Sequence, residues 1–252
     1  MNSSRRYFLK VAGLSTFALA AGAVNAEAAE ATYEAYPEAK KAKRWAMVID
    51  TRRFKTPESV RPIVEACNKV HNVPSKPGPK EVKWIWDDTF EHAFADDPNP
   101  ILPKDIEERR FLLLCNHCTN PSCVRVCPAG ATYKVEGGLV AIDYHRCVGC
   151  RFCMAACPYG SRSFNFSDPR PYIKELNPAY PTRMRGVVEK CTFCAERLEK
   201  GQLPACVEAS NGAIMFGDLN DPNSIVRRVL SKNYCIRRKP SLGTDAGVYY
   251  II

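Results

Sequence analysis

Hydrophobic residues occur along this 252-residue chain mostly in short runs separated by polar and turn-forming residues. Such runs are typical of short buried strands rather than of long amphipathic helices. The runs next to the cysteine-rich segments predict strands at Ala46–Asp50, Phe111–Leu114, Val187–Glu189 and Ala213–Gly217.

A hairpin is predicted between Thr132–Val135 and Leu139–Asp143, because a Glu-Gly-Gly turn separates the two segments. Helical turns are expected at Pro121, after Arg151 and at Ala195–Lys200. Short strands combined with short helical turns predict an α+β fold.

The N-terminus carries a different pattern. Arg5, Arg6 and Lys10 precede an uncharged run from Val11 to Val24, and small residues surround Ala26. The run has about 14 residues, whereas a membrane-spanning helix needs roughly 20. Residues 1–26 are therefore predicted to be a twin-arginine export signal, which places the protein in the periplasm or on the extracytoplasmic face of the membrane. A chance basic amphiphile is the alternative, and a signal retained as a tether stays open. Because no other segment could span a bilayer, membrane association is expected through partners.

The formal net charge of +9 includes the three basic residues of that segment. The remaining excess fits an ordinary solvated surface or docking to acidic surfaces. No basic stripe with interleaved aromatic residues occurs, so nucleic acid is not an expected partner.

The unusual feature of the composition is thirteen cysteines. One run is Cys115-x2-Cys118-x4-Cys123-x3-Cys127-Pro, and the other is Cys147-x2-Cys150-x2-Cys153-x3-Cys157-Pro. The second spacing is that of bacterial two-cluster ferredoxins, in which the fourth cysteine of a run binds the other cluster. Three thiolates on a tight loop can bind three irons of a cubane, while the fourth cysteine begins a turn that leads away.

This exchange predicts two [4Fe–4S] ligand sets. Set A is Cys115, Cys118, Cys123 and Cys157, and set B is Cys147, Cys150, Cys153 and Cys127. A less complete third group, Cys191, Cys194 and Cys206, needs a fourth ligand, and the same exchange points to Cys67. These four cysteines form set C, and Cys235 is left as a buried or free thiol.

Three other interpretations of the cysteines compete. Disulfides are common in exported proteins, but pairing within such dense triplets would strain their geometry. Zinc sites use Cys-x2-Cys pairs, but interleaved triplets followed by Cys-Pro are not a zinc-ribbon pattern. Free structural cysteines have no reason to occur at fixed spacings.

The chain resembles the four-cluster ferredoxin-like electron-transfer subunits that accompany molybdopterin oxidoreductases and polysulfide-reductase-type membrane proteins. The segments that carry the resemblance are Trp45–Asp50, Cys115–Cys123, Cys147–Cys153, Gly186–Cys191 and Leu242–Tyr250. The resemblance implies two interleaved ferredoxin-like βαβ modules with long loops and insertions. One module is residues 111–185, which hold sets A and B. The other combines residues 27–110, including an insertion at 72–110, with residues 186–252 and holds set C.

Within this family, four segments are most similar to the DsrO-type periplasmic subunits of DsrMKJOP complexes: His71–Pro74, Glu81–Trp86, Gly160–Phe166 and Asp168–Pro171. Family members carry a further cysteine triplet where this chain has Thr51–Val60, and a last cysteine where it has Ser210. In family members the four cysteines at those positions would bind one cluster. This chain has no cysteine at any of the four. The resemblance therefore implies three [4Fe–4S] clusters, with an oxygen ligand at Ser210 as a minor alternative.

The expected function is electron relay through these clusters in dissimilatory sulfur metabolism, without catalytic residues or a small-molecule substrate of its own. The resemblance implies three kinds of partner: a quinone-interacting DsrP-like membrane subunit, a DsrJ-like multihaem cytochrome c and other Dsr subunits. The alternatives are the iron–sulfur subunit of a molybdopterin oxidoreductase and, in a different class, a stand-alone metal-binding redox enzyme.

Two further features have two interpretations each. The Pro- and Lys-rich insertion 72–110, with Trp84 and Trp86, is either a loop covering a module or a docking segment for a partner. His71, His117 and His145 lie near predicted ligands. They are either capping or solvated residues, or donors of hydrogen bonds that tune cluster potentials.

Overall fold

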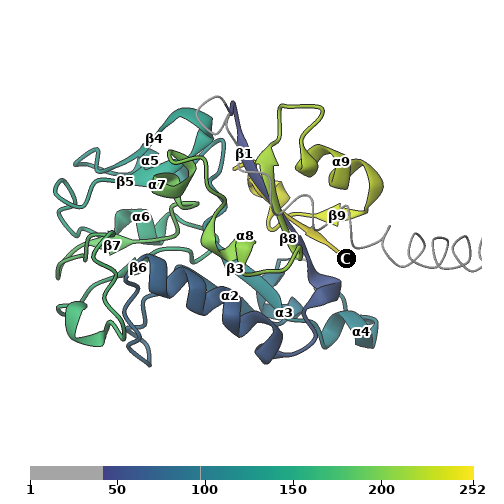
Figure 1. Cartoon of the computed structure of the whole chain (residues 1–252), viewed down its shortest axis with the longest axis horizontal. Coiled ribbons are helices and arrows are strands. Elements are labelled where there is room, and N and C mark those ends of the chain that lie inside the picture. Colours follow the sequence, from purple (N-terminus) through teal and green to yellow (C-terminus); the bar gives the residue numbers. More distant parts are fainter. Residues whose placement is uncertain (1–41, 97) are drawn as a thin grey trace, which may run out of the picture.

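The computed structural model describes residues 42–96 and 98–252 as an α+β fold of small sheets and mostly short helices (Figure 1). The strands are β1 Trp45–Asp50, β2 Ile85–Asp88, β3 Phe111–Leu114, β4 Thr132–Lys134, β5 Val140–Ile142, β6 Ser163–Phe164, β7 Val188–Glu189, β8 Ile214–Asp218, β9 Cys235–Ile236 and β10 Val248–Ile251. The α-helices are α2 Pro57–Val70, α3 Phe90–Ala93, α4 Lys104–Glu107, α5 Ser122–Arg125, α6 Phe152–Ala155, α7 Ala195–Leu198, α8 Ala205–Glu208 and α9 Ile225–Lys232. The 3-10 helices are η2 Thr51–Arg53, η3 Glu136–Gly138, η4 Arg170–Tyr172 and η5 Pro240–Leu242.

The largest sheet has the strand order β8-β1-β10-β9. Strand β1 pairs antiparallel with β8 and parallel with β10, so the first and last strands of the described chain lie side by side. This parallel pairing brings Met47 opposite Val248. The sheet thus joins the two ends of the described chain.

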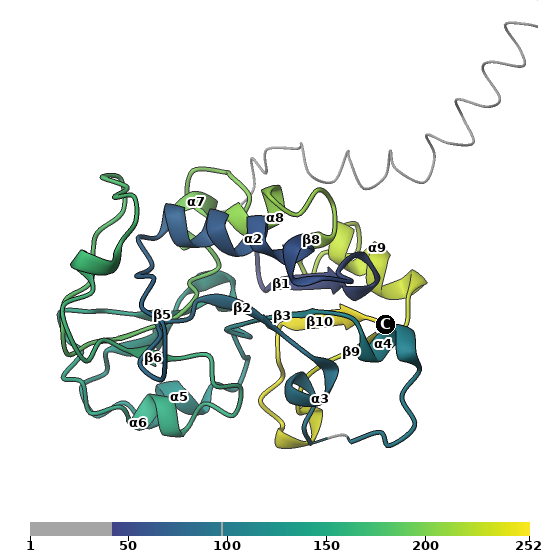
Figure 2. The ribbon, with the colours of Figure 1, turned by 90° about the horizontal axis from the view of Figure 1, so that it is seen from below.

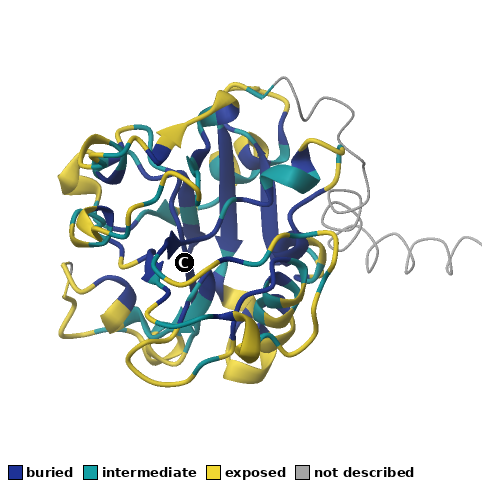
Figure 3. Cartoon of the chain, turned by 90° about the vertical axis from the view of Figure 1, so that its left-hand side faces the viewer, coloured by how far each residue is buried: buried dark blue, intermediate teal, exposed yellow. Residues whose placement is uncertain are grey.

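Strand β1 is buried on both faces, because its side chains alternate between two cores. Trp45, Met47 and Ile49 belong to the main hydrophobic core, whereas Ala46 and Val48 pack in a smaller core beneath α9. Figure 3 shows the buried central strands surrounded by exposed loops. The strand predicted from this apolar run is therefore confirmed.

Helix α2 is an element that the hydrophobic pattern did not predict. It begins with Pro57 at its first position, where the missing N–H costs no hydrogen bond. Val60, Ile63 and Cys67 form its buried face, at spacings of three and four residues. The helix packs against α8 and β2, and its last turns hold Cys67 in the interior. In Figure 2, α2 and α8 lie on one side of the molecule and α5 and α6 on the opposite side.

The middle of the 72–110 insertion contains a strand next to a buried tryptophan. β2 pairs antiparallel with β3, and Trp84 is 1% exposed with its Nε1 donating to Glu189 Oε2 at 2.8 Å. This part of the insertion therefore covers the fold, as the first of the two interpretations expected.

The predicted hairpin is confirmed as β4 paired with β5, and the helical turns are confirmed as α5, α6 and α7. Two pairings, β2 with β3 and β6 with β7, join residues on either side of the predicted module bounds. The predicted signal, residues 1–26, lies outside the described residues. Among the described helices, none has the length and apolar character needed to cross a bilayer.

Candidate metal centres

The three Cys-x2-Cys loops share one backbone feature. The residue before the second cysteine has a positive φ in each: 40° at His117, 71° at Gly149 and 56° at Phe193. This left-handed residue reverses the chain, which lets the two thiols of a loop face the same space. At Gly149 a side chain would not fit, because a Cβ would lie 2.3 Å from the carbonyl oxygen of Gly186.

A short helix follows each loop and carries the next cysteine as its second residue: Cys123 in α5, Cys153 in α6 and Cys206 in α8. Four residues further along the chain stand Cys127, Cys157 and Ser210. The backbone then turns, as the carbonyl of each accepts a hydrogen bond from the N–H three residues later. The loop, helix and turn thus form a unit that occurs three times.

The structure brings the thiols of set A together from the end of β3, the following loop, α5 and the end of α6. Burial raises the pKa of Cys118 to about 12, and neighbouring charge on Cys115, Cys123 and Cys157 contributes to the rise. Thiols that disfavour each other's ionisation in this way need a nearby positive charge to become thiolates together. A coordinated metal supplies that charge.

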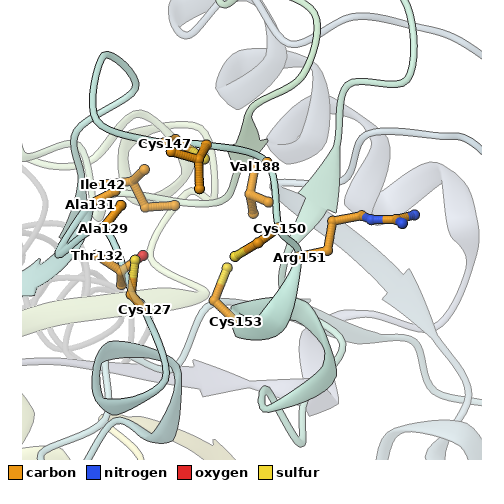
Figure 4. A pocket seen from close by; sticks show the side chains of 12 residues that line it. Cys127, Ala129, Ala131, Thr132, Ile142, Cys147, Cys150, Arg151, Cys153 and Val188 are labelled. Carbon is orange, nitrogen blue, oxygen red and sulfur yellow. The ribbon is translucent and has the colours of Figure 1, made fainter.

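Set B surrounds a small hollow that is open to solvent (Figure 4). The hollow is lined by Cys127, Cys147, Cys150 and Cys153, together with apolar residues that include Ile142 and Val188. Slight burial raises the pKa of Cys127, but hydrogen bonds from backbone N–H groups at Thr132, Ala131 and Ala129 outweigh it. Its pKa therefore lies below the usual value, which favours the thiolate form that binds metals.

Set C lies in the interior. Cys67, Cys191, Cys194 and Cys206 are each between 4% and 7% exposed. Burial raises the pKa of Cys67 well above its usual value, and charge on the other three cysteines raises it further. Backbone N–H groups at Phe193 and Ala205 donate to the Sγ atoms of Cys191 and Cys194, each at 3.4 Å. None of the chain's thirteen cysteines, all of which are described, forms a disulfide.

Unpaired polar atoms lie inside two of the loops. Both amide atoms of Asn116 and the hydroxyl of Thr192 are buried and have no hydrogen-bond partner among the described residues. Each residue directly follows the first cysteine of its loop, Cys115 in set A and Cys191 in set C. Because buried polar groups are almost always hydrogen-bonded, these atoms indicate a further polar group among the thiols. The sulfides of an iron–sulfur cluster could accept hydrogen bonds from the side-chain N–H of Asn116 and the hydroxyl of Thr192, so the residues present fit that cofactor.

Ser210 occupies the position that corresponds to Cys127 and Cys157, yet its surroundings differ. It is 6% exposed, its Oγ donates to Val207 O at 2.7 Å, and the same Oγ accepts from Ile214 N at 3.0 Å. Both hydrogen bonds join the Ser210 side chain to nearby backbone atoms, so Ser210 serves as a turn residue.

Phe54 lies in the segment that lacks the expected cysteine triplet. It is 2% exposed and belongs to the main core.

The histidines differ from one another. His145 has a 90% exposed side chain beside Asp143, which fits the interpretation as a solvated residue. His117 is buried. It accepts a hydrogen bond from Val140 N and donates its Nε2–H to Cys191 O at 3.2 Å. Its ring stacks on Phe193, with 3.9 Å between the ring centroids.

His71 is buried beside set C, with Nε2 2.9 Å from Glu196 Oε1 and Nδ1 3.6 Å from Cys67 Sγ. Ligand atoms of His71, Cys194 and Glu196 lie within 4.8 Å of one another, so this trio belongs to the surroundings of set C. The spare Cys235 is half-buried in β9, with Arg52 and Asp50 as charged neighbours.

Two buried cations near the thiols were not predicted from the sequence. Arg162 is 5% exposed and Lys190 is 1% exposed. Lys190 stands directly before Cys191, and this position was the only available signal in the sequence.

Comparison with known protein families gives a match to the 4Fe-4S dicluster domain over residues 109–169 and 171–219. These segments contain every predicted ligand except Cys67.

Relatives extend over most or nearly all of the chain. Hdr-like menaquinol oxidoreductase iron-sulfur subunit 1 of Archaeoglobus fulgidus is 42% identical, covering 98% of this chain and 97% of its own length. The iron-sulfur cluster-binding subunit of the menaquinone reductase of Nitratidesulfovibrio vulgaris is 35% identical, covering 82% of this chain and 88% of its own. Protein NrfC of Escherichia coli is 34% identical, covering 75% and 73% respectively.

Proposed function

This chain belongs to the family of iron–sulfur electron-transfer subunits that bind [4Fe–4S] clusters, and we propose that it relays electrons through three clusters held by sets A, B and C. Each cluster supplies reversible one-electron chemistry at a potential set by its surroundings. The polypeptide contributes the spacing, the insulation and the local charge.

The observation that carries this proposal is the serial order B–A–C. Set A adjoins set B where Cys123 of α5 and Cys153 of α6 belong to one small hydrophobic core. Set A adjoins set C where His117 stacks on Phe193 and donates to Cys191 O. The central position of set A makes the three sets a path through the protein, as relay requires.

Set B is the exposed end of this path. Cys150 is exposed, and its neighbours Val148 and Phe152 are 71% and 60% exposed. Arg146 and Arg151 add positive charge around these apolar side chains. An apolar patch beside a redox centre, with a basic border, fits a partner that exchanges electrons at this point.

We assign this patch to a quinone-interacting membrane subunit of the polysulfide-reductase type, similar to DsrP. The names of two relatives, a menaquinol oxidoreductase and a menaquinone reductase, support quinone as the redox partner of such a complex. A DsrJ-like multihaem cytochrome c and other Dsr subunits complete the proposed complex. Residues 1–26 would export the chain to the periplasmic face by the twin-arginine route.

Iron and acid-labile sulfide counts on anaerobically purified protein test the number of clusters. Three cubanes predict roughly 12 of each per chain. A count near 16 would require a fourth ligand set, and a count near 8 would remove one of the three.

A docking variant tests the role of set B. Val148→Asp should slow quinol-dependent reduction of the clusters in the purified complex and leave the iron count unchanged. Tyr234→Asp is the matched control, because Tyr234 is 80% exposed between α9 and β9, at the opposite end of the molecule from α6 (Figure 1). Equal rates in the two variants would contradict docking at set B.

Purification of the native complex separates the candidate functions. Recovery of a multihaem cytochrome c with a membrane subunit supports the Dsr-type complex, whereas recovery of a molybdenum subunit supports a molybdopterin oxidoreductase. Turnover by the isolated chain would instead indicate a stand-alone enzyme.

A further inference from the structure

Arg162 is held rigidly between the two halves of the ferredoxin-like region. Its Nη2 donates to the Sγ of Cys123 at 3.0 Å, and its Nη1 donates to Thr132 Oγ1 at 3.2 Å. The preceding residue, Ser161, donates its hydroxyl hydrogen to Leu114 O at 2.9 Å, next to Cys115. The following residue, Ser163, is paired with Glu189 in the β6–β7 ladder. The chain is therefore anchored on both sides of Arg162, and this fixes the position of its guanidinium.

The charge of this side chain lacks an ordinary counter-ion. Arg162 is 5% exposed, yet within residues 42–96 and 98–252 it forms no ion pair with a carboxylate. Burying an unpaired cation is strongly unfavourable, so a buried arginine requires an anion close to it. The anions within reach are the thiolates of the ligand sets.

Those thiolates belong to two different sets. Negative charge on Cys123, Cys115 and Cys153 offsets the burial of Arg162 and raises its pKa above the usual value. Cys123 and Cys115 belong to set A, and Cys153 belongs to set B. The second hydrogen bond of the guanidinium goes to Thr132, which lines the hollow of set B. The guanidinium thus lies at the junction of the two sets and donates directly to a thiol of set A.

We propose that Arg162 is a positioning residue that raises the reduction potentials of the clusters in sets A and B relative to the cluster in set C. The proposal rests on the proposed function, since it requires clusters at those sets. One electron passes from one cluster to its neighbour, so one is oxidised as the other is reduced, with no bond formed or broken and no proton moved. A fixed cation at the junction stabilises the added negative charge on either side, more strongly at set A than at set B.

Set C has different charges around it. Lys190 donates to the carbonyl oxygens of Val140 and Cys191, the latter at 2.7 Å, and Glu196 lies beside Cys194 and His71. Within the described chain, the guanidinium of Arg162 donates to Cys123 and Thr132 and not to a cysteine of set C. The cluster of set C therefore provides an internal reference in the same molecule.

The test is an EPR-monitored potentiometric titration of anaerobically purified holoprotein with and without Arg162→Gln. We expect two of three midpoint potentials to fall, the larger shift reaching at least a tenfold change in the reduction equilibrium, which is about 59 mV for a one-electron couple. The third potential should stay within experimental error. Arg162→Lys keeps the charge and should retain most of the wild-type potentials.

Every other outcome of these measurements also supports or contradicts the proposal. Unchanged potentials, or equal shifts of all three, would overturn the proposal while leaving a normal iron count and the proposed function intact. If Arg162→Gln loses about two thirds of its iron and Arg162→Lys keeps it, the charge is required at both sets, which supports the proposal. If both variants lose that iron, the shape of the guanidinium matters rather than its charge, and the electrostatic proposal fails. A low iron count in the wild type would instead contradict the proposed function.

Discussion

Sets B and C are built from the same loop, helix and turn, yet they lie in opposite surroundings. Cys150 of set B is exposed and its hollow is open to solvent, whereas all four thiols of set C are buried. The spacing of the cysteines therefore does not determine how exposed a set of thiols is. The covering elements decide it, because α2 and α8 enclose set C while the β4–β5 hairpin leaves set B partly open.

The two sets are also connected differently to the hydrophobic cores. Cys67, Cys191 and Cys206 belong to the main core, with Ile63 and Phe193 among their neighbours. Cys153 of set B belongs to a small separate core with Cys123, Val140 and Val188. Loss of the cofactor at set C should consequently weaken the whole fold, and loss at set B should have a local effect.

Removal of one ligand from each set is expected to give the largest difference. Cys67→Ser should lose the cluster of set C and destabilise the protein by about 4 kcal/mol or more, since loss of a buried metal site is among the most severe mutational effects. That loss corresponds to a fall in Tm of roughly 10 °C for a chain of this size. Thermal unfolding at a fixed scan rate provides the measurement.

The matched variant is Cys150→Ser, which should lose the same amount of iron and change Tm much less. Iron counting on both variants verifies that each has lost one cluster. An equal or larger fall in Tm for Cys150→Ser would contradict the contrast between the two sets.

A second prediction concerns the polar network between the two sets. Glu189 in β7 is fully buried and accepts hydrogen bonds from Arg183 Nε at 2.7 Å, Trp84 Nε1 at 2.8 Å and Asn165 Nδ2. Glu189→Ala would leave the buried guanidinium of Arg183 unpaired, at a cost of about 3–5 kcal/mol. Urea unfolding measures the loss.

Arg183 also donates to the backbone oxygens of His71 and Asn72, close to set C, while Val188 lines the hollow of set B. Both sets should therefore lose iron faster in the Glu189 variant. Asp168→Ala is the control, because the exposed pair of Asp168 and Arg170 should leave stability unchanged within error. A neutral effect of Glu189→Ala would show that the network is dispensable.

Local apolar runs were sufficient to predict β1, β3, β7 and β8, because strands buried on both faces carry a strong sequence signal. The pairing of β1 with β10 could not be predicted, since residues about 200 positions apart share no local pattern. Helix α2 was missed because only Val60, Ile63 and Cys67 form its buried face, and Pro62 interrupts its sequence.

The predicted grouping of the cysteines rests on spacing and, for Cys67, on ligand exchange, because the geometry of ligation constrains which thiols a loop can bring together. The cations near those thiols had no such constraint. A single arginine or lysine is usually a surface residue, and only the three-dimensional structure shows Arg162 and Lys190 buried, with no ion pair to a carboxylate of the described residues. Burial of His117 and His71 was likewise invisible in the sequence.

A third prediction uses metal removal. Under anaerobic conditions a mild iron chelator should remove roughly a third of the iron in an early phase, corresponding to set B, which solvent reaches directly. Set C should lose its iron only with unfolding of the main core. In Cys150→Ser the early phase should be absent, which assigns it to set B. Simultaneous loss from all sets would mean that solvent access does not distinguish them.

The smallest expected effect concerns Asp245, in the segment whose backbone is hydrogen-bonded to Asn116 and Thr119 beside the thiols of set A. Although partial burial raises the pKa of Asp245, hydrogen bonds from Arg44 and Arg237 hold it below its usual value. Because the folded pKa is depressed, the stabilisation is present above the unfolded pKa near 3.9 and is lost as pH falls through the folded value. It is complete at pH 7, where Asp245→Asn should cost about 1 kcal/mol or less, since solvent screens this half-exposed group.

High salt is the practical way to weaken this interaction, because acid would also decompose the clusters. The difference in unfolding free energy between wild type and Asp245→Asn should shrink in 1 M salt, where the Debye length is about 3 Å. Backbone bonds from Thr119 N to Asp245 O and from Gly247 N to Asn116 O should hold the segment in place in the variant. Iron release from set A should therefore stay at the wild-type rate, and faster release would show that the ion pairs, rather than those backbone bonds, hold the segment beside set A.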